Sequence, residues 1–566
     1  MSLKRLFFAM MLVALCLATP FAAWCAVSPD AQTNTVSGSP CPRYAAGSSL
    51  VEAKDLFSKH GVLKVTLSYK TRVDADGNTL FCFTSEDGAQ SPTLHVWPGD
   101  ELLITLKNEL PSSTTPSFKK HEMKGMSGMG SMPTPEMSIS GAGLKNCGGM
   151  VMTDSSVNIH YHGTNTPPKC HQDEVIKTLV NAGETFEYDV HFPYDEPAGL
   201  YWYHPHIHGI SEPAVQGGAS GAIIVEGIEN INHDVAGLPE RTLLVRDNLV
   251  PGNPDPNGNM PAWDVSVNYI PVAYPAYTPA VIPMKPLQRQ FWRVVNASAD
   301  TILDLQVQYD GTPQTLGVVA IDGVPTGSQD GRSEGKTLEW KHILLAPAAR
   351  AEFMVTAPGK NVKNATLMTL NVDTGPDGDN DPERPLASIK TSATAAEPTL
   401  SVAKVSGPPM LPLRFAGLAE AKPVKQRKLY FSEVLSDPTD PNSPTNFYIT
   451  VDGATPTLFD PDNPPAIVTT QGSVEDWTIE NRALENHEFH IHQIHFLVLA
   501  KDGKPVEGQY RDMINVPYWS GTGPYPSVTL RMDFRGPDIG DFVYHCHILG
   551  HEDSGMMAII RVLPKN

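Results

Sequence analysis

Basic residues are scarce in this 566-residue chain, where 42 lysines and arginines stand against 62 aspartates and glutamates and give a formal net charge of −20. A phosphate backbone is held mainly by lysine and arginine, so this balance argues against nucleic acid as a partner. It suits cationic partners, including metal ions. Apolar residues make up 41% and charged residues 18%, as in an ordinary folded protein and unlike a disordered chain.

The chain also lacks an apolar run long enough to span a membrane, which takes ~20 residues. Two basic residues precede a shorter apolar run over residues 6–18, and small residues follow it. This order is typical of an export signal, so residues 1–26 are predicted to be a signal peptide, with cleavage after Ala23 or Ala26. We expect the mature protein to be periplasmic or secreted, by either the general or the twin-arginine route.

Cysteines are few, and none of the seven lies in the C-x-x-C spacing that structural zinc prefers. Two fall in the predicted signal peptide, and Cys546 lies in a histidine-rich segment. The four that remain allow three pairings in an oxidising compartment: Cys41, Cys82, Cys147 and Cys170. We favour the pairs Cys41 with Cys82 and Cys147 with Cys170, while other pairings and buried free thiols stay open.

Long stretches of helical periodicity are absent, and short alternating strands broken by glycine and proline take their place. Strands at this spacing, with turn signals between them, are typical of β-sandwiches and barrels. One hydrophobic core rarely grows beyond ~300 residues, so several domains are needed. We predict an all-β protein of three tandem domains over residues 45–230, 238–395 and 410–566.

The strand pattern lapses between about residues 111 and 150, in a methionine-rich insert of the first domain. Thioether sulfur is a soft ligand suited to Cu(I), so the insert is a candidate auxiliary copper site. Its methionines are Met123, Met126, Met129, Met132 and Met137. The alternative is a loop whose methionines bind nothing.

Ten of the 19 histidines fall in four short clusters, each with an H-x-H pair. They are His160 and His162; His204 and His206; His487, His490 and His492; and His545, His547 and His551. In an extended strand both histidines of such a pair point to the same face, because side chains alternate with period two. Paired imidazoles on one face suit a polynuclear metal site.

The same alternation separates Cys546 from its neighbours in the segment HCHILGHEDSGMM. If His545 and His547 face one way, Cys546 faces the other, and one tripeptide can serve two metal sites. Cys546, His551 and Met556 with one further histidine make the His₂Cys set with a weak axial methionine that marks a blue-copper electron-transfer centre. Zinc is the alternative metal, but its usual cysteine spacing is missing.

The four clusters, in this order, resemble the copper motifs of the multicopper oxidases, the family of laccases, bilirubin oxidases and bacterial cuprous oxidases. The resemblance covers roughly the mature chain. It implies three cupredoxin-like Greek-key domains and four copper ions. One type 1 ion would lie in the third domain, and one type 2 and two type 3 ions would lie between the first and third domains.

Position by position, the resemblance also implies a ligand set for each ion. Type 1 copper would take His487, Cys546 and His551 with Met556 axial and Met557 as its rival; type 2 copper would take His160 and His490; the type 3 ions would take His162, His204 and His547, and His206, His492 and His545.

Two carboxylates are candidates for supplying the protons that dioxygen reduction consumes. Glu552 matches the acidic relay position of many bacterial members of the family. Asp173 is the candidate for the second family acid, with Glu174 as its rival, because PKCHQDEV lacks the glycine that often follows that aspartate. A solvated surface role is the alternative for either carboxylate.

The resemblance implies one-electron oxidation of a reductant at type 1 copper and reduction of dioxygen to water. An axial methionine favours a low type 1 potential, so phenols, aromatic amines and Cu(I) are the expected reductants. We predict a laccase-like oxidase of phenolic or aromatic reductants. The alternative is a periplasmic cuprous oxidase in copper tolerance, which the methionine-rich insert favours. A non-catalytic copper-binding protein is a remote alternative, because no expected ligand is missing. The oligomeric state is not predicted.

Overall fold

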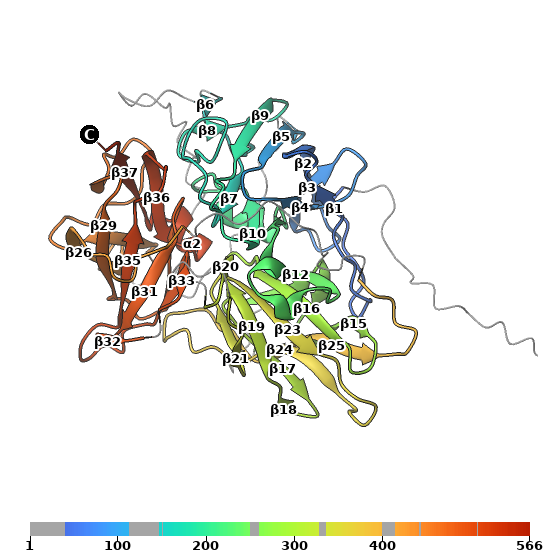
Figure 1. Ribbon diagram of the computed structural model, residues 1–566. Coiled ribbons are helices and arrows are strands. Elements are labelled where there is room, and N and C mark those ends of the chain that lie inside the picture. The colour runs from blue at the N-terminus through green and yellow to red at the C-terminus, as the bar shows by residue number, and fades with distance from the viewer. Residues whose placement is uncertain are drawn as a thin grey trace, which may run out of the picture.

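The computed structural model describes residues 40–111, 147–149, 151–249, 260–327, 335–398, 414–440, 443–506 and 508–565. The predicted signal peptide and the five insert methionines lie outside these ranges. Within them, no helix has the length and apolar character needed to cross a membrane. Figure 1 shows the strands gathered in three bodies, coloured blue to teal, green to yellow and orange to red along the chain. We call them the first, middle and third bodies.

The first body is built from two main sheets around one core. One sheet has the order β1 (Asp55–Phe57), β4 (Thr93–Val96), β11 (Gly221–Val225), β10 (Gly199–His204) and β7 (His160–His162). The other has the order β3 (Thr79–Ser85), β2 (Val62–Val73), β5 (Glu101–Asn108) and β9 (Thr185–His191), and β6 (Cys147–Gly148) pairs with β8 (Thr178–Leu179). Strand β9 shows why these segments are strands: Phe186, Tyr188 and Val190 alternate with exposed residues and fill the core.

The middle body repeats this arrangement around the core that contains Trp292 and Phe353. Its larger sheet has the order β14 (Ile270–Val272), β13 (Trp263–Val267), β12 (Glu240–Leu249), β16 (Arg289–Asn296), β23 (Arg350–Thr356), β19 (Leu316–Ile321) and β20 (Val324–Pro325), with β21 (Leu338–Trp340) beside β19. Its smaller sheet has the order β15 (Ala280–Met284), β25 (Arg384–Thr391), β24 (Ala365–Thr369), β17 (Leu303–Tyr309) and β18 (Thr312–Pro313), with β22 (Ile343–Leu345) beside β17.

The third body packs two sheets around Trp477, Phe489 and Cys546. One sheet has the order β27 (Thr445–Val451), β26 (Lys425–Leu435), β29 (Val474–Asn481), β35 (Ser527–Asp533), β31 (Phe496–Lys501) and β32 (Lys504–Pro505), with β33 (Tyr510–Arg511) beside β31. The other has the order β28 (Ile467–Thr470), β37 (Met557–Leu563), β36 (Gly540–Cys546), β30 (His487–Ile491) and β34 (Met513–Val516). The prediction of an all-β chain is confirmed, while the domain boundaries stay a prediction.

Short helices join the third body to the first. The helical elements are α1 (Ser211–Gln216), α2 (Leu549–Asp553), η1 (Ile228–Asn230) and η2 (His233–Val235). The Asp553 carboxylate at the end of α2 accepts hydrogen bonds from the backbone N–H groups of Gly209 (2.7 Å) and Glu212 (2.9 Å) beside and in α1. Both helices follow directly on histidine clusters, so this contact holds the clusters of the two bodies together.

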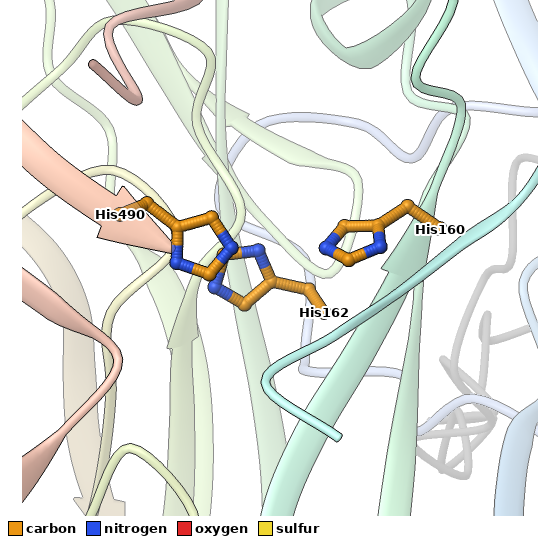
Figure 2. Close-up of side chains that lie close together, drawn as sticks. All are labelled: His160, His162 and His490. Atoms are coloured by element: carbon orange, nitrogen blue, oxygen red, sulfur yellow. The ribbon is translucent and has the colours of Figure 1, made fainter. Parts of the chain in front are cut away.

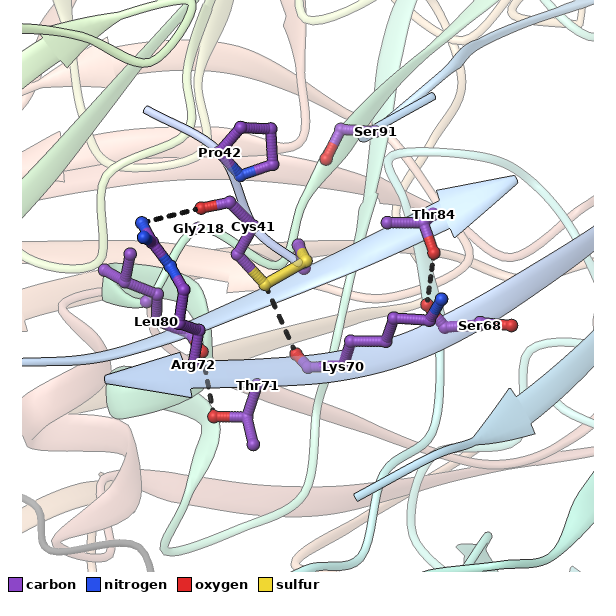
Figure 3. The surroundings of a disulfide bond; sticks show 12 residues. Cys41, Pro42, Ser68, Lys70, Thr71, Arg72, Leu80, Thr84, Ser91 and Gly218 are labelled. Carbon is purple, nitrogen blue, oxygen red and sulfur yellow. Dashed lines mark hydrogen bonds between the residues drawn. A yellow bond between two sulfur atoms is a disulfide. The ribbon is translucent and has the colours of Figure 1, made fainter. Parts of the chain in front are cut away.

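Both favoured disulfides are present, and they stabilise the first body. Cys41 is bonded to Cys82 in β3, with their Cα atoms 5.4 Å apart, and Cys147 is bonded to Cys170. Figure 3 shows the first of these, where Arg72 of β2 donates a hydrogen bond to the Cys41 carbonyl oxygen at 3.2 Å. The N-terminal segment is thereby tied to two neighbouring strands.

Candidate metal centre

Paired strands place the H-x-H motifs opposite one another. In the first body β7 runs antiparallel to β10, so that His160 lies opposite His204. In the third body β30 runs antiparallel to β36, so that His490 lies opposite His545. Figure 2 shows His160 and His162 of β7 facing His490 of β30 across the boundary between the two bodies.

Eight histidines from these motifs form one buried group, which we call the histidine cluster. Its members are His160, His162, His204, His206, His490, His492, His545 and His547, each at most 2% exposed. Within it, ligand atoms lie within 4.8 Å of one another in three sets: His160, His162 and His490; His162, His204 and His547; and His206, His492 and His545. The structure thus brings together the histidines that the resemblance assigned to type 2 and type 3 copper.

The ring nitrogens of the cluster are arranged for a cation. Nε2 of His545 lies 3.3 Å from Nε2 of His206 and 3.2 Å from Nε2 of His492. Nε2 of His204 and of His490 are buried without a hydrogen-bond partner. Burial is the largest effect on both rings and lowers the pKa of His204 to about 3 and of His490 to about 4. Neutral imidazoles with unused lone pairs fit bound metal ions, and copper accepts such ligands.

The outer nitrogen of each of several rings is held by an oxygen atom, which sets the ring's orientation. His204 and His545 use Nδ1 toward the carbonyl oxygens of Pro205 (2.9 Å) and Cys546 (2.8 Å). His490 Nδ1 lies 2.8 Å from the carbonyl oxygen of Asp512. Such partners fix which nitrogen is left for a metal and raise its basicity.

Asp173 contacts the cluster directly, whereas its rival Glu174 does not. The Asp173 carboxylate lies 2.9 Å from His160 Nδ1 and accepts a hydrogen bond from Gln493 Nε2 at 2.7 Å. Glu174 instead accepts hydrogen bonds from its own turn, including one of 2.7 Å from the Thr178 hydroxyl. Burial raises the pKa of Asp173 well above its usual range.

Glu552, in α2, lies beside two other histidines of the cluster. Its carboxylate oxygens are 3.3 Å from His545 Nδ1 and 3.7 Å from His206 Nδ1. Burial, and then the charge of Asp553, raises the pKa of Glu552 well above its usual range. Both predicted acids are therefore fully buried and next to histidines of the cluster.

A second set, the sulfur group, consists of His487, Cys546 and His551. Cys546 Sγ lies 3.6 Å from His487 Nδ1 and 3.9 Å from His551 Nδ1, and these two nitrogens are 3.2 Å apart. Burial raises the pKa of the Cys546 thiol, so a thiolate here needs a bound cation. Met556 is fully buried in the same core, and its carbonyl oxygen accepts a hydrogen bond from the Cys546 N–H at 3.1 Å. Cys546 is the free cysteine of the described part of the chain.

An acidic edge borders the sulfur group. Glu433 Oε1 lies 2.8 Å from His487 Nε2, and Glu485 Oε1 lies 3.4 Å from His551 Nε2. These side chains are 15% and 8% exposed. Burial, and then the charges of Glu433 and of Asp379 in the middle body, raise the pKa of Glu485 well above its usual range.

Other histidines in or near the motifs stay outside these sets. His495 is fully buried, and its Nε2 lies 2.9 Å from the carbonyl oxygen of Asp322. His208 packs edge-on against the Phe459 ring at 4.9 Å.

Several residues around the candidate ligands, which contact them directly or through one carboxylate, were not found by sequence reasoning. They are Arg350, Glu433, Glu485, Gln493 and Asp512. Gln493 directly follows His492, and Glu485 lies two residues before His487, but no motif marks any of the five residues, and each contact is made only in the folded chain. One sequence signal does point to this region: Gly163 directly follows the HYH motif. The side chains of Arg350 and Asp512 lie so close to the backbone at Gly163 that any larger residue would collide with them.

Known proteins are similar to this chain in sequence and fold. The sequence matches the multicopper oxidase family over residues 151–230 and again over residues 438–566. It is 24% identical to a multicopper oxidase of Staphylococcus aureus over 72% of this chain and 77% of that protein. It is also 24% identical to a laccase of Bacillus subtilis over 70% of this chain and 78% of that protein. Among solved structures, a Campylobacter jejuni multicopper oxidase described as a metallo-oxidase superposes with a TM-score of 0.61 at 21% identity, covering 91% of this chain and 95% of that one.

Proposed function

The chain belongs to the multicopper oxidase family of copper-dependent oxidoreductases that use oxygen, and we propose that it couples one-electron oxidation of a reductant at the sulfur group to reduction of dioxygen to water at the histidine cluster. One observation carries this proposal. Cys546 belongs to the sulfur group, while His545 and His547 on either side of it belong to two separate sets of the cluster.

Four copper ions would be held: one by His487, Cys546 and His551 with Met556 as a further ligand, one by His160 and His490, and one by each of the other two histidine sets. Copper there would supply one-electron exchange with the reductant and four-electron reduction of dioxygen. The protein's own part is to hold the rings, through the outer oxygens already described, and to keep water out of the buried site. The tripeptide around Cys546 is a continuous covalent path between the two centres.

Asp173 and Glu552 are proposed to hold protons beside the cluster. Asp173 would hold its proton at the contact with His160 Nδ1, and Glu552 would hold its proton close to His545 and His206. They approach the cluster from different bodies, Asp173 from the first and Glu552 from the third, and they lie beside different histidines.

Phenolic or aromatic compounds are the first proposed reductants. The histidines of the sulfur group turn their Nε2 atoms toward the acidic edge, where a phenol hydroxyl could donate to a carboxylate. Cu(I), or another metal cation, is the second candidate, because the two neighbouring carboxyl groups of Glu433 and Glu485 offer oxygen atoms to a cation, which would displace the proton that the raised pKa of Glu485 favours. The similar Campylobacter jejuni enzyme is described as a metallo-oxidase.

Oxygen consumption by the copper-loaded mature protein tests both proposals, with 2,6-dimethoxyphenol and Cu(I) as alternative reductants. Replacing Glu433 and Glu485 with glutamine should raise KM about tenfold for Cu(I), the equivalent of ~1.4 kcal/mol, if the reductant is a cation. Glu339→Gln, on an exposed strand of the middle body, is the control. Deleting residues 119–137 tests whether the insert delivers Cu(I). Copper binding with a blue colour but no oxygen uptake would contradict the proposed oxidase.

A further inference from the structure

Arg350 of β23 is a fully buried side chain of the middle body that reaches both other bodies. Its Nη1 and Nη2 atoms donate to the two carboxylate oxygens of Asp512 in the third body, at 2.7 and 2.6 Å. Its Nε donates to the carbonyl oxygen of Leu200 in β10 of the first body at 3.1 Å. One planar guanidinium therefore joins three bodies in a fixed orientation.

Asp512 passes this orientation to two histidines of the cluster. Its carbonyl oxygen lies 2.8 Å from His490 Nδ1, and its carboxylate Oδ1 lies 3.4 Å from His162 Nε2. The His162 and His490 rings are stacked, with centroids 4.0 Å apart and planes 17° from parallel. A single residue thus borders the outer edges of two stacked rings that come from different bodies.

Gly163 shows how closely the charged pair fits against the strand that carries His162. A Cβ atom at Gly163 would lie 2.3 Å from Arg350 Nη2 and 2.4 Å from Asp512 Oδ2. The residue also has φ +83°, which favours glycine. The glycine of the HYHG motif is therefore required where this pair meets the cluster.

We propose that the Arg350–Asp512 pair is a positioning device, through which the middle body orients His162 and His490 for their copper ions. The inference rests on the proposed function of the cluster. The carbonyl oxygen of Asp512 takes up His490 Nδ1 and leaves His490 Nε2 for metal, an atom that is buried without a hydrogen-bond partner. Both ring nitrogens of His162 are likewise buried without a hydrogen-bond partner, and the Asp512 carboxylate approaches the ring on its Nε2 side. A bidentate pair holds this arrangement more rigidly than a single hydrogen bond.

The first test uses Asp512→Asn and Arg350→Lys in the full-length holoprotein. Outer partners of metal ligands are typically worth 10- to 100-fold in metal affinity. We expect copper of the cluster to dissociate ~10- to 100-fold more readily into a chelator, and the EPR signal of the non-blue copper to change. The blue absorption of the sulfur group should persist, because neither residue contacts His487, Cys546 or His551.

The second variant removes the pair without leaving a buried charge alone. Arg350→Met combined with Asp512→Leu replaces both partners by apolar side chains, a change that often preserves stability. It keeps the backbone carbonyl at position 512, so only the carboxylate and the guanidinium are lost. The same loss of cluster copper with a retained blue band is expected.

Arg293→Lys is the matched control. Arg293 lies in β16 of the same sheet, is equally buried, and pairs with Glu240 and Glu352, but the structure shows no contact from it to a cluster histidine. The Arg293→Lys variant should keep the copper of the histidine cluster and an unchanged EPR signal.

Three results would overturn the positioning role. The first is unchanged copper retention and an unchanged EPR signal in the Arg350 and Asp512 variants. The second is an equal loss of cluster copper in the Arg293→Lys control. The third is that every variant of the pair fails to develop the blue band while Arg293→Lys develops it. Failure of the proposed function would instead be visible in the unmodified protein, as absent copper uptake or absent oxygen consumption.

Discussion

His490 in β30 lies directly opposite His545 in β36, and the next pair along the two strands is Phe489 with Cys546. Because side chains alternate along a strand, the first pair faces the histidine cluster and the second faces the core of the third body. The two candidate copper sites thus lie on opposite faces of this sheet, and their residues follow one another directly along β36. A side-chain change at Cys546 can alter one site and leave the other in place.

Replacing Cys546 with serine should abolish the intense blue absorption, because the thiolate ligand is lost. The copper content should fall by about one ion in four, since no cluster histidine changes. Oxygen consumption should fall to background. Visible spectroscopy and metal analysis of the same sample provide the measurement, and a persisting blue band would contradict the assignment of the sulfur group.

Asp173→Asn should lower the rate of oxygen consumption ~10- to 100-fold at saturating reductant, because it weakens the contact that orients His160. The neighbouring Glu174→Gln is the matched control, since Glu174 hydrogen-bonds only within its own turn among the contacts described. Rates within twofold of the wild type are expected for this control. Equal losses in the two variants would argue that the whole turn, and not the Asp173 carboxylate, is needed.

His95 should make the stability of the first body depend on pH. It is 2% exposed, with Nδ1 2.6 Å from Glu226 and Nε2 3.0 Å from Asp55. Burial acts to lower its pKa, but hydrogen bonds to Asp55 and Glu226 and their charges prevail and raise the pKa to about 9. Protonated His95 therefore adds about 3 kcal/mol to the free energy of unfolding. This contribution is fully present below ~6.5, the pKa of histidine in the unfolded chain, and is lost as the pH rises through about 9.

Thermal unfolding of the metal-free protein checks this dependence. The midpoint difference between wild type and His95→Gln should be largest near pH 6 and should narrow toward pH 10. His191→Gln is a control, because His191 is half exposed. A difference that stays constant with pH would refute the ion-pair explanation.

Removing the Cys41–Cys82 disulfide by a double serine substitution should destabilise the first body by about 4 kcal/mol. The bond closes a loop with a sequence separation of 41, and the loss follows from the larger conformational entropy of the opened unfolded chain. The thermal midpoint should fall while copper content at low temperature is unchanged, because neither cysteine is near the cluster ligands. Unaltered thermal unfolding would show that the bond contributes nothing.

The candidate ligands and the all-β class were predictable because they rest on local spacing. An H-x-H pair points both rings to one face of a strand wherever the strand lies, and HCH divides its cysteine from its histidines by the same rule. Asp173 was predictable only as one of two adjacent carboxylates. The folded turn decided between them, since it directs Asp173 to His160 and Glu174 to the backbone.

The sequence by itself determined which residues are candidate metal ligands and that strands present them. Only the tertiary structure decided what surrounds them. Glu433 at His487, Glu485 at His551, and Arg350 with Asp512 beside His162 come from strands and loops far apart in the chain. No local pattern marks a contact of this kind, because it depends on how three separately built bodies pack and on the buried charges that their packing brings together.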